Sequence, residues 1–141
     1  MLVVDTSVAV KWVVPGDGEG IEAGTDAALE LLAHDLHAPD FLLGEFGNAL
    51  FKKVQRREIG SEQALAAFAI LPETVTLFPA ADLIEPALRL ALDIVHPVHD
   101  CVFLIGAIQL GVPLVTADVK FFRNCMRRGA PFPIRLLGDE T

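Results

Sequence analysis

A series of short apolar runs, separated by helical patterns, constrains this chain more than any other feature. The runs 2–4 and 112–115 contain only apolar residues, and they lead to Asp5 and Asp118. Runs of this kind are typical of parallel strands that are buried on both faces of a sheet. Further strands are predicted at 37–38, 75–78 and 134–137. The chain is therefore predicted to contain about five short strands.

Helical patterns fill the segments between these strands. Helices are predicted over 7–14, 26–33, 41–57, 61–71, 82–93, 98–110 and 118–128. Ser61 is expected to cap the fourth helix, and the Gly-rich, acidic segment 15–25 is expected to be a mobile loop. Strands that alternate with helices predict a layered α/β fold. A chain of 141 residues, 52% of them hydrophobic, is long enough for a single domain over 1–141 and too short for two.

The sequence contains no signal for a membrane or secreted protein. Its apolar runs are shorter than the roughly 20 residues that span a bilayer. The residues after Met1 show neither a basic region nor a small-residue cleavage site. Cys101 and Cys125 lack the spacing of metal ligands, so we expect both to be reduced and structural. We therefore expect a cytoplasmic protein.

The net charge of -8 argues against a protein that holds nucleic acid by its overall field. Eight of the eleven basic residues nevertheless fall in two short stretches, Lys52, Lys53, Arg56, Arg57 and Lys120, Arg123, Arg127, Arg128. The first stretch ends a predicted helix, where cations are favoured by the helix dipole whatever the function. The same stretch is also a candidate to guide an RNA backbone, and both interpretations stay open at this point.

Four acids form the candidate functional site. Asp5 and Asp118 stand at or just past the carboxyl ends of predicted strands, where ligands collect in open α/β sheets. Glu45 shares a helix face with Asn48, and Asp100 opens a helix that is apolar almost all round. Each acid alone has an ordinary explanation as a helix cap or a solvated side chain. Several like charges near one place cost free energy unless a cation neutralises them, so together they favour a hard metal ion with oxygen ligands.

The segments around these acids resemble the four motifs of PIN domains, and specifically those of VapC-type toxins from bacterial toxin–antitoxin pairs. The segments are Val4-Asp5-Thr6-Ser7-Val8, Glu45-Phe46-x-Asn48-Ala49-Leu50, His99-Asp100-Cys101-x-Phe103-Leu104-Ile105-Gly106-Ala107 and Leu114-Val115-Thr116-Ala117-Asp118-x-x-Phe121. The resemblance implies a PIN-like fold, with a central, mostly parallel sheet and helices on both sides. It also implies Mg²⁺ or Mn²⁺ at the acids, cleavage of single-stranded or loop RNA, a homodimer, and inhibition by a small VapB-like antitoxin.

The resemblance carries over residue by residue. Asp5, Glu45, Asp100 and Asp118 match the family's acidic positions, which makes them the expected metal ligands and catalytic groups. The side chains expected to support them are Thr6, Ser7, Asn48 and Thr116. His99 stands where the family often has Tyr, and Lys120 occupies a position at which some members carry a further acid.

Three other interpretations compete with this one. His96 and His99 could bind a transition metal beside Asp100, although Pro97 is expected to break any shared helical face. A metal-dependent phosphohydrolase for small substrates normally needs an Asp-x-Asp pair, which the segment 5–7 lacks. A non-catalytic module of the same fold would bind RNA or a partner without cutting, and a metal-dependent cleavage assay separates it from the enzyme.

Overall fold

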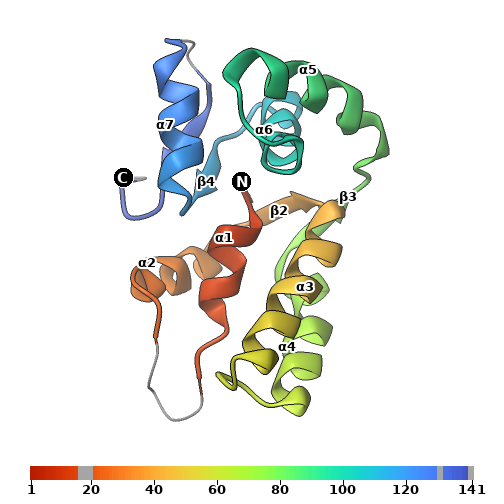
Figure 1. Ribbon diagram of the computed structural model, residues 1–141, viewed down its shortest axis with the longest axis vertical. Coiled ribbons are helices and arrows are strands. Elements are labelled where there is room, and N and C mark those ends of the chain that lie inside the picture. Colours follow the sequence, from red (N-terminus) through yellow and green to blue (C-terminus); the bar gives the residue numbers. More distant parts are fainter. Residues whose placement is uncertain (16–20, 130–131, 140–141) are drawn as a thin grey trace.

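The computed structural model describes residues 1–15, 21–129 and 132–139, and its centre is one five-stranded sheet (Figure 1). The strands are β1 (Leu2–Val4), β2 (Leu36–Pro39), β3 (Thr76–Phe78), β4 (Leu114–Thr116) and β5 (Ile134–Leu136). Their order is β3-β2-β1-β4-β5, and every neighbouring pair is parallel. The expected α/β fold with about five short strands is confirmed, and the sheet is parallel throughout.

Seven α-helices surround the sheet in the described part of the chain. They are α1 (Thr6–Ala9), α2 (Thr25–Glu30), α3 (Phe41–Gln55), α4 (Ser61–Thr74), α5 (Ile84–Ile94), α6 (Val98–Leu110) and α7 (Val119–Arg127). In Figure 1, α5, α6 and α7 lie above the strands β2 and β4, and α1 to α4 lie below them. α6 packs on β1, β2 and β4, and α3 contacts both α1 and β2.

Several boundaries differ from the sequence-based expectations, among them those of α1 and α4. The first helix is only one turn of α-helix, continued by the 3₁₀ turn Val10–Trp12. α4 begins at Ser61, but its N-cap is Gly60 and no side chain caps it, so the capping prediction for Ser61 was wrong. The same helix runs through Pro72 to Thr74, because the Val75 amide still donates to the Leu71 carbonyl at 3.0 Å. Part of the loop expected to be mobile, 16–20, lies outside the described residues.

The core includes the face where α6 packs on the central strands. Its residues from Cys101 to Leu104 are fully buried, which agrees with the apolar pattern of this segment. Gly106 allows the close approach, because a Cβ atom there would lie 2.9 Å from the Phe78 ring of β3. None of the described helices is by itself long and apolar enough to cross a membrane. Ala81–Ile94 and Val98–Leu110 have the required length and apolar character only when they are taken together, and a bend of 113° separates them.

The register of the sheet places two polar residues side by side. Val4 pairs with Val115 across β1 and β4, so the next residue of each strand, Asp5 and Thr116, meet at the carboxyl edge. Because all five strands are parallel, their carboxyl ends share this edge, and the loops to α1 and α7 start there. The fold therefore brings residues from both ends of the chain to one site.

Candidate functional site

Asp5 is the most buried acid of the site, with 2% of its surface exposed. One carboxylate oxygen accepts a hydrogen bond from Ser7 Oγ at 2.5 Å and a long one from the Val8 amide at 3.4 Å. The other oxygen accepts from Thr116 Oγ1 at 2.5 Å. Desolvation nevertheless raises the pKa of Asp5 from its ordinary 3.8 to about 7, and the charge of Asp100 adds to this effect. The three hydrogen-bond donors therefore do not compensate for the desolvation of the ionised carboxylate at this position.

The hydroxyl groups of Ser7 and Thr116 join the ends of β1 and β4. Ser7 Oγ accepts a hydrogen bond from the Ala117 amide at 2.8 Å while it donates to Asp5. Thr116 Oγ1 accepts from the Asp118 amide at 3.1 Å while it donates to the other oxygen of Asp5. Because each hydroxyl accepts from one strand end and donates to Asp5, the carboxylate is held in a fixed orientation.

Glu45 approaches the site from α3. Its Oε1 accepts a hydrogen bond of 2.6 Å from the hydroxyl group of Thr6, the first residue of α1. Burial raises its pKa and the charge of Asp100 adds to this, while the Thr6 hydrogen bond and His99 oppose it. Glu45 and Asn48 line one surface hollow together with Asp40, Phe41 and Gly44. The expected pairing of a carboxylate and an amide on one face of this helix is therefore present.

Asp100 and Asp118 lie close together where α6 and α7 begin. Ligand atoms of His96, Asp100 and Asp118 all lie within 4.8 Å of one another. The Asp100 side chain is 19% exposed, and its Oδ2 is 2.6 Å from His96 Nε2. His99, which is half exposed, places its Nε2 3.5 Å from the other oxygen of Asp100. Two of the four predicted acids therefore share a space the size of an ion site.

Helix capping explains only part of this arrangement. Asp118 caps α7 by accepting from the Phe121 amide at 3.1 Å, and Asp5 caps α1 weakly. Asp100 caps nothing, because the N-cap of α6 is Pro97 and the Asp100 carboxylate faces His96. Glu45 is held by Thr6 and partly buried, so it is not a simple solvated side chain. Two of the four acids thus lack the ordinary explanation that each could have had alone.

A divalent cation fits this donor set. Asp100 raises the pKa of both Asp5 and Glu45, so its carboxyl group lies within electrostatic reach of each of the other two. Mutual repulsion of buried acids is relieved when a cation binds between them. Carboxylate oxygens are the ligands that Mg²⁺ and Mn²⁺ prefer. The thiols of Cys101 and Cys125 are poor ligands here, because burial raises the pKa of each to about 12.

The sequence analysis missed the contacts of two residues. His96 was considered only as a transition-metal ligand together with His99, and Pro97 was expected to break their shared helical face. In the structure Pro97 is the N-cap of α6, and His96 Nε2 lies 2.6 Å from Asp100 Oδ2. Asn124 of α7 places its Nδ2 2.9 Å from His96 Nδ1. The i,i+4 spacing of His96 and Asp100 was the available signal for the first residue, but no local pattern points to Asn124.

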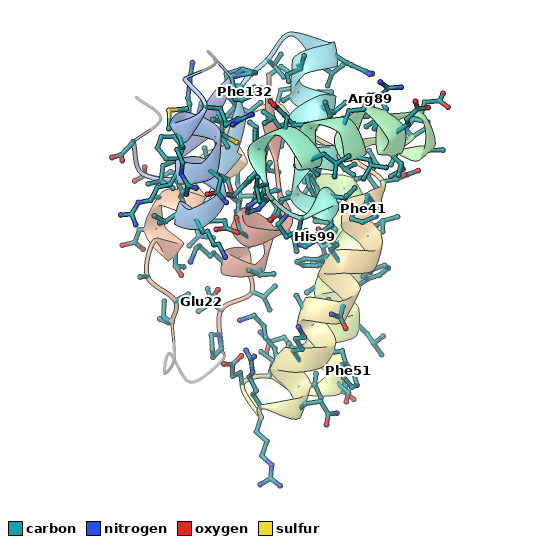
Figure 2. The ribbon with its side chains drawn as sticks, turned by 45° about the horizontal axis from the view of Figure 1, so that its top comes forward. Glu22, Phe41, Phe51, Arg89, His99 and Phe132 are labelled. Carbon is teal, nitrogen blue, oxygen red and sulfur yellow. The ribbon has the colours of Figure 1, made fainter. Side chains whose placement is uncertain are left out.

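The basic stretch on α3 lies at the other end of that helix. Figure 2 shows His99 near Phe41, close to the end of α3 that carries Glu45, with Phe51 towards the far end. Lys52, Arg56 and Arg57 are exposed. Lys53 is buried, and its ammonium group is 3.7 Å from Glu58 and 4.0 Å from Glu22. Three of the four cations expected to bind RNA are thus open to a ligand, and the fourth is held by two acids.

Comparisons with known proteins agree with this architecture. The family model for the PIN domain matches residues 2–125. One similar solved structure is VapC20 from Mycobacterium tuberculosis, a toxin that cleaves the sarcin–ricin loop. It is 23% identical to this chain, the alignment covers 87% of this chain and 94% of VapC20, and the TM-score is 0.66. A chain of VapBC2 from Rickettsia felis, bound to a DNA fragment from its promoter, has 18% identity, coverages of 96% and 97%, and a TM-score of 0.63. No curated protein matches.

Proposed function

The chain belongs to the PIN-domain family, and we propose that it is a metal-dependent endoribonuclease that serves as the toxin of a toxin–antitoxin pair. The observation that carries the enzymatic part is the acid cluster at the carboxyl edge of the sheet. Asp5 has 2% of its surface exposed and a pKa of about 7, and a second acid, Asp100, contributes to that shift. Such a cluster costs folding free energy without a cation, which argues for a retained functional role.

Each residue has a distinct role in this proposal. Asp5, Glu45, Asp100 and Asp118 hold Mg²⁺ or Mn²⁺ through carboxylate oxygens. Ser7 and Thr116 fix the orientation of Asp5, and Thr6 fixes that of Glu45. A bound divalent ion activates water for attack on a phosphodiester and neutralises charge on the leaving oxygen. Asn48 lines the hollow beside Glu45, where its amide can donate a hydrogen bond to a phosphate oxygen.

RNA is the substrate that the surface charge favours. Lys52, Arg56 and Arg57 lie at the carboxyl end of α3, away from Glu45, and Arg56 is about 16 Å from Glu45 at the usual helical rise of about 1.5 Å per residue. Exposed cations at this distance can bind backbone phosphates on either side of a scissile bond. We propose single-stranded or loop RNA of the cytoplasm as the substrate, and VapC20, which has a similar fold, cleaves such a loop.

We also propose a homodimer and a small VapB-like antitoxin as partners. One of the similar solved structures is that of VapBC2 bound to a DNA fragment from its promoter. The surface of this chain supports the proposal, because several large apolar side chains of α4 and α5 are exposed, among them Leu65, Phe68, Ile70, Leu88 and Leu92. Leu65 and Phe68 line one surface groove together with Phe51, and exposed apolar patches of this kind mark interaction surfaces on small proteins. Light scattering of the purified protein tests the dimer, and a monomer across micromolar concentrations would contradict it.

The enzymatic proposal is tested by incubating end-labelled RNA with the protein and Mg²⁺ or Mn²⁺. We expect cleavage to 5′-phosphate and 3′-hydroxyl ends, because the attacking group is water rather than the 2′-hydroxyl of the RNA. Asp5→Asn should abolish cleavage, whereas Asp26→Asn, at an exposed acid on α2, should leave it unchanged. Cyclic 2′,3′-phosphate ends, or full activity in excess chelator, would contradict the proposal. Tight RNA binding without cleavage would instead indicate a non-catalytic module.

A further inference from the structure

His96 sits between the acid cluster and α7 with both ring nitrogens engaged. Its side chain is 3% exposed, and its ring stacks on Phe121 with a centroid distance of 4.6 Å and an interplanar angle of 23°. Nε2 lies 2.6 Å from Asp100 Oδ2, and Nδ1 lies 2.9 Å from Asn124 Nδ2. The ring is therefore fixed in its plane by two hydrogen bonds and on its face by an aromatic side chain.

The exposed guanidinium of Arg127 determines the direction of these hydrogen bonds. Arg127 Nη2 is 2.6 Å from Asn124 Oδ1, and a guanidinium can only donate. The oxygen of the Asn124 amide must therefore face Arg127, which leaves its N–H group facing His96. Because His96 Nδ1 accepts that hydrogen bond, the ring proton is on Nε2 and points at Asp100. The chain of donors runs in one direction, from Arg127 through Asn124 and His96 to the acid cluster.

The backbone next to His96 is also unusual. Val95 adopts the left-handed conformation, with φ 56° and ψ 59°, and its side chain is 80% exposed. A β-branched residue is strained there, and packing of its exposed side chain does not compensate. The turn lets the His96 amide donate to the Ala91 carbonyl at 3.1 Å, which ends α5 and directs the ring inward. Strain of this kind is held in place by the contacts of its neighbours, here those of His96.

We propose that His96 is a positioning residue for Asp100, supported by Asn124 and Arg127, and that it is not itself a metal ligand. The inference rests on the proposed metal site. A bond from His96 Nε2 to an ion would require loss of the hydrogen bond to Asp100. The other ring nitrogen, Nδ1, already accepts a hydrogen bond from Asn124. Asp100 Oδ2 is engaged by His96 at 2.6 Å, whereas Oδ1 has only the longer contact of 3.5 Å with the half-exposed His99, so Oδ1 is the oxygen more open to an ion. The donor set is then carboxylate only, which suits Mg²⁺ or Mn²⁺ rather than Zn²⁺, Cu²⁺ or Ni²⁺, for which imidazole is the better ligand.

The first test asks whether nitrogen coordinates Mn²⁺. Electron spin-echo envelope modulation of the Mn²⁺-loaded protein detects a directly bound nitrogen. The spectrum is recorded in a His99→Gln background, so that the other imidazole near Asp100 is removed. We expect no coordinated nitrogen. A coordinated nitrogen that disappears when His96→Ala is added would show that His96 is a ligand and would overturn the inference.

The second test measures Mn²⁺ affinity by calorimetry, with the fold checked by circular dichroism in chelator. His96→Ala should bind Mn²⁺ about 10- to 100-fold more weakly, which is the usual effect of removing a group that orients a metal ligand. His96→Gln retains an N–H group of similar reach and should recover most of this loss. A folded His96→Ala protein with the affinity of the parent would refute the positioning role. A parent that binds no Mn²⁺ would instead refute the proposed metal site itself.

The third test needs no change in the buried site. Arg127→Gln removes the outer donor, and Arg128→Gln is its matched control, because Arg128 makes an equally short hydrogen bond of 2.6 Å to Asp93 on the surface. We expect weaker Mn²⁺ binding in Arg127→Gln and parental binding in Arg128→Gln. If His96→Ala does not fold, this pair still decides the question, since equal affinities in the two variants would contradict the chain of donors.

Discussion

Asp5 should make the stability of the metal-free protein depend on pH. Its pKa is about 7 in the folded protein, chiefly because it is desolvated, against an ordinary 3.8 for a solvated carboxyl in the unfolded chain. Between these two values the folded state holds a proton that the unfolded state has lost. The contribution of Asp5 to the free energy of unfolding therefore falls as the pH rises from about 4 to about 7, and it stays low above that range.

The size of this effect follows from the two pKa values. The interval between 3.8 and about 7 corresponds to a destabilisation of about 4 kcal/mol at pH 8, at roughly 1.4 kcal/mol per pH unit. Asp5→Asn removes this penalty but puts an NH₂ group in place of one carboxylate oxygen, so that Ser7 or Thr116 loses its acceptor at a cost of about 1 to 3 kcal/mol. We therefore expect the metal-free variant to be more stable than the parent by about 1 to 3 kcal/mol at pH 8.

Urea unfolding in excess chelator, from pH 5 to pH 8, measures this effect. In the difference in unfolding free energy between Asp5→Asn and the parent, the contributions of the other titrating groups cancel because both proteins share them. It should grow by about 2 to 3 kcal/mol between pH 5 and pH 8. Asp26→Asn, at an exposed acid, is the control and should give no such trend. A flat difference, or an Asp5→Asn variant that is less stable than the parent at pH 8, would refute the reasoning.

Three further predictions concern the surroundings of the site. Replacing Lys52, Arg56 and Arg57 by Gln should weaken RNA binding and lower the slope of log K against log salt by about 2, at roughly 0.7 per phosphate contact, while calorimetry shows unchanged Mn²⁺ affinity. Adding Lys53→Gln should mainly lower the melting temperature, because it removes the partner of Glu58 and Glu22. Gly106→Ala should destabilise the fold by about 1 kcal/mol in urea titrations, because its Cβ would meet the Phe78 ring at 2.9 Å.

Most of the fold could be predicted because its signals are local. Leu2–Val4 and Leu114–Thr116 are buried strands, as their apolar runs indicated, and the middle of α6 is buried nearly all round. The errors were at helix ends, as with Ser61 and Pro72, where neighbouring residues do not decide which hydrogen bonds form. Asp5 and Asp118 could be assigned to strand ends for the same local reason, since each directly follows its apolar run.

The sequence by itself determined the elements and the residue types of the site, because periodicity and short-range hydrogen bonds depend on neighbours along the chain. Only the tertiary structure decided how those residues face one another. Thr116 meets Asp5 across 111 residues, and His96 meets Asn124 across 28. Lys53 looks like its basic neighbours in the sequence, yet it is buried between two acids. Such contacts arise from strand register and helix packing, which bring together groups whose separation in the sequence carries no periodic signal.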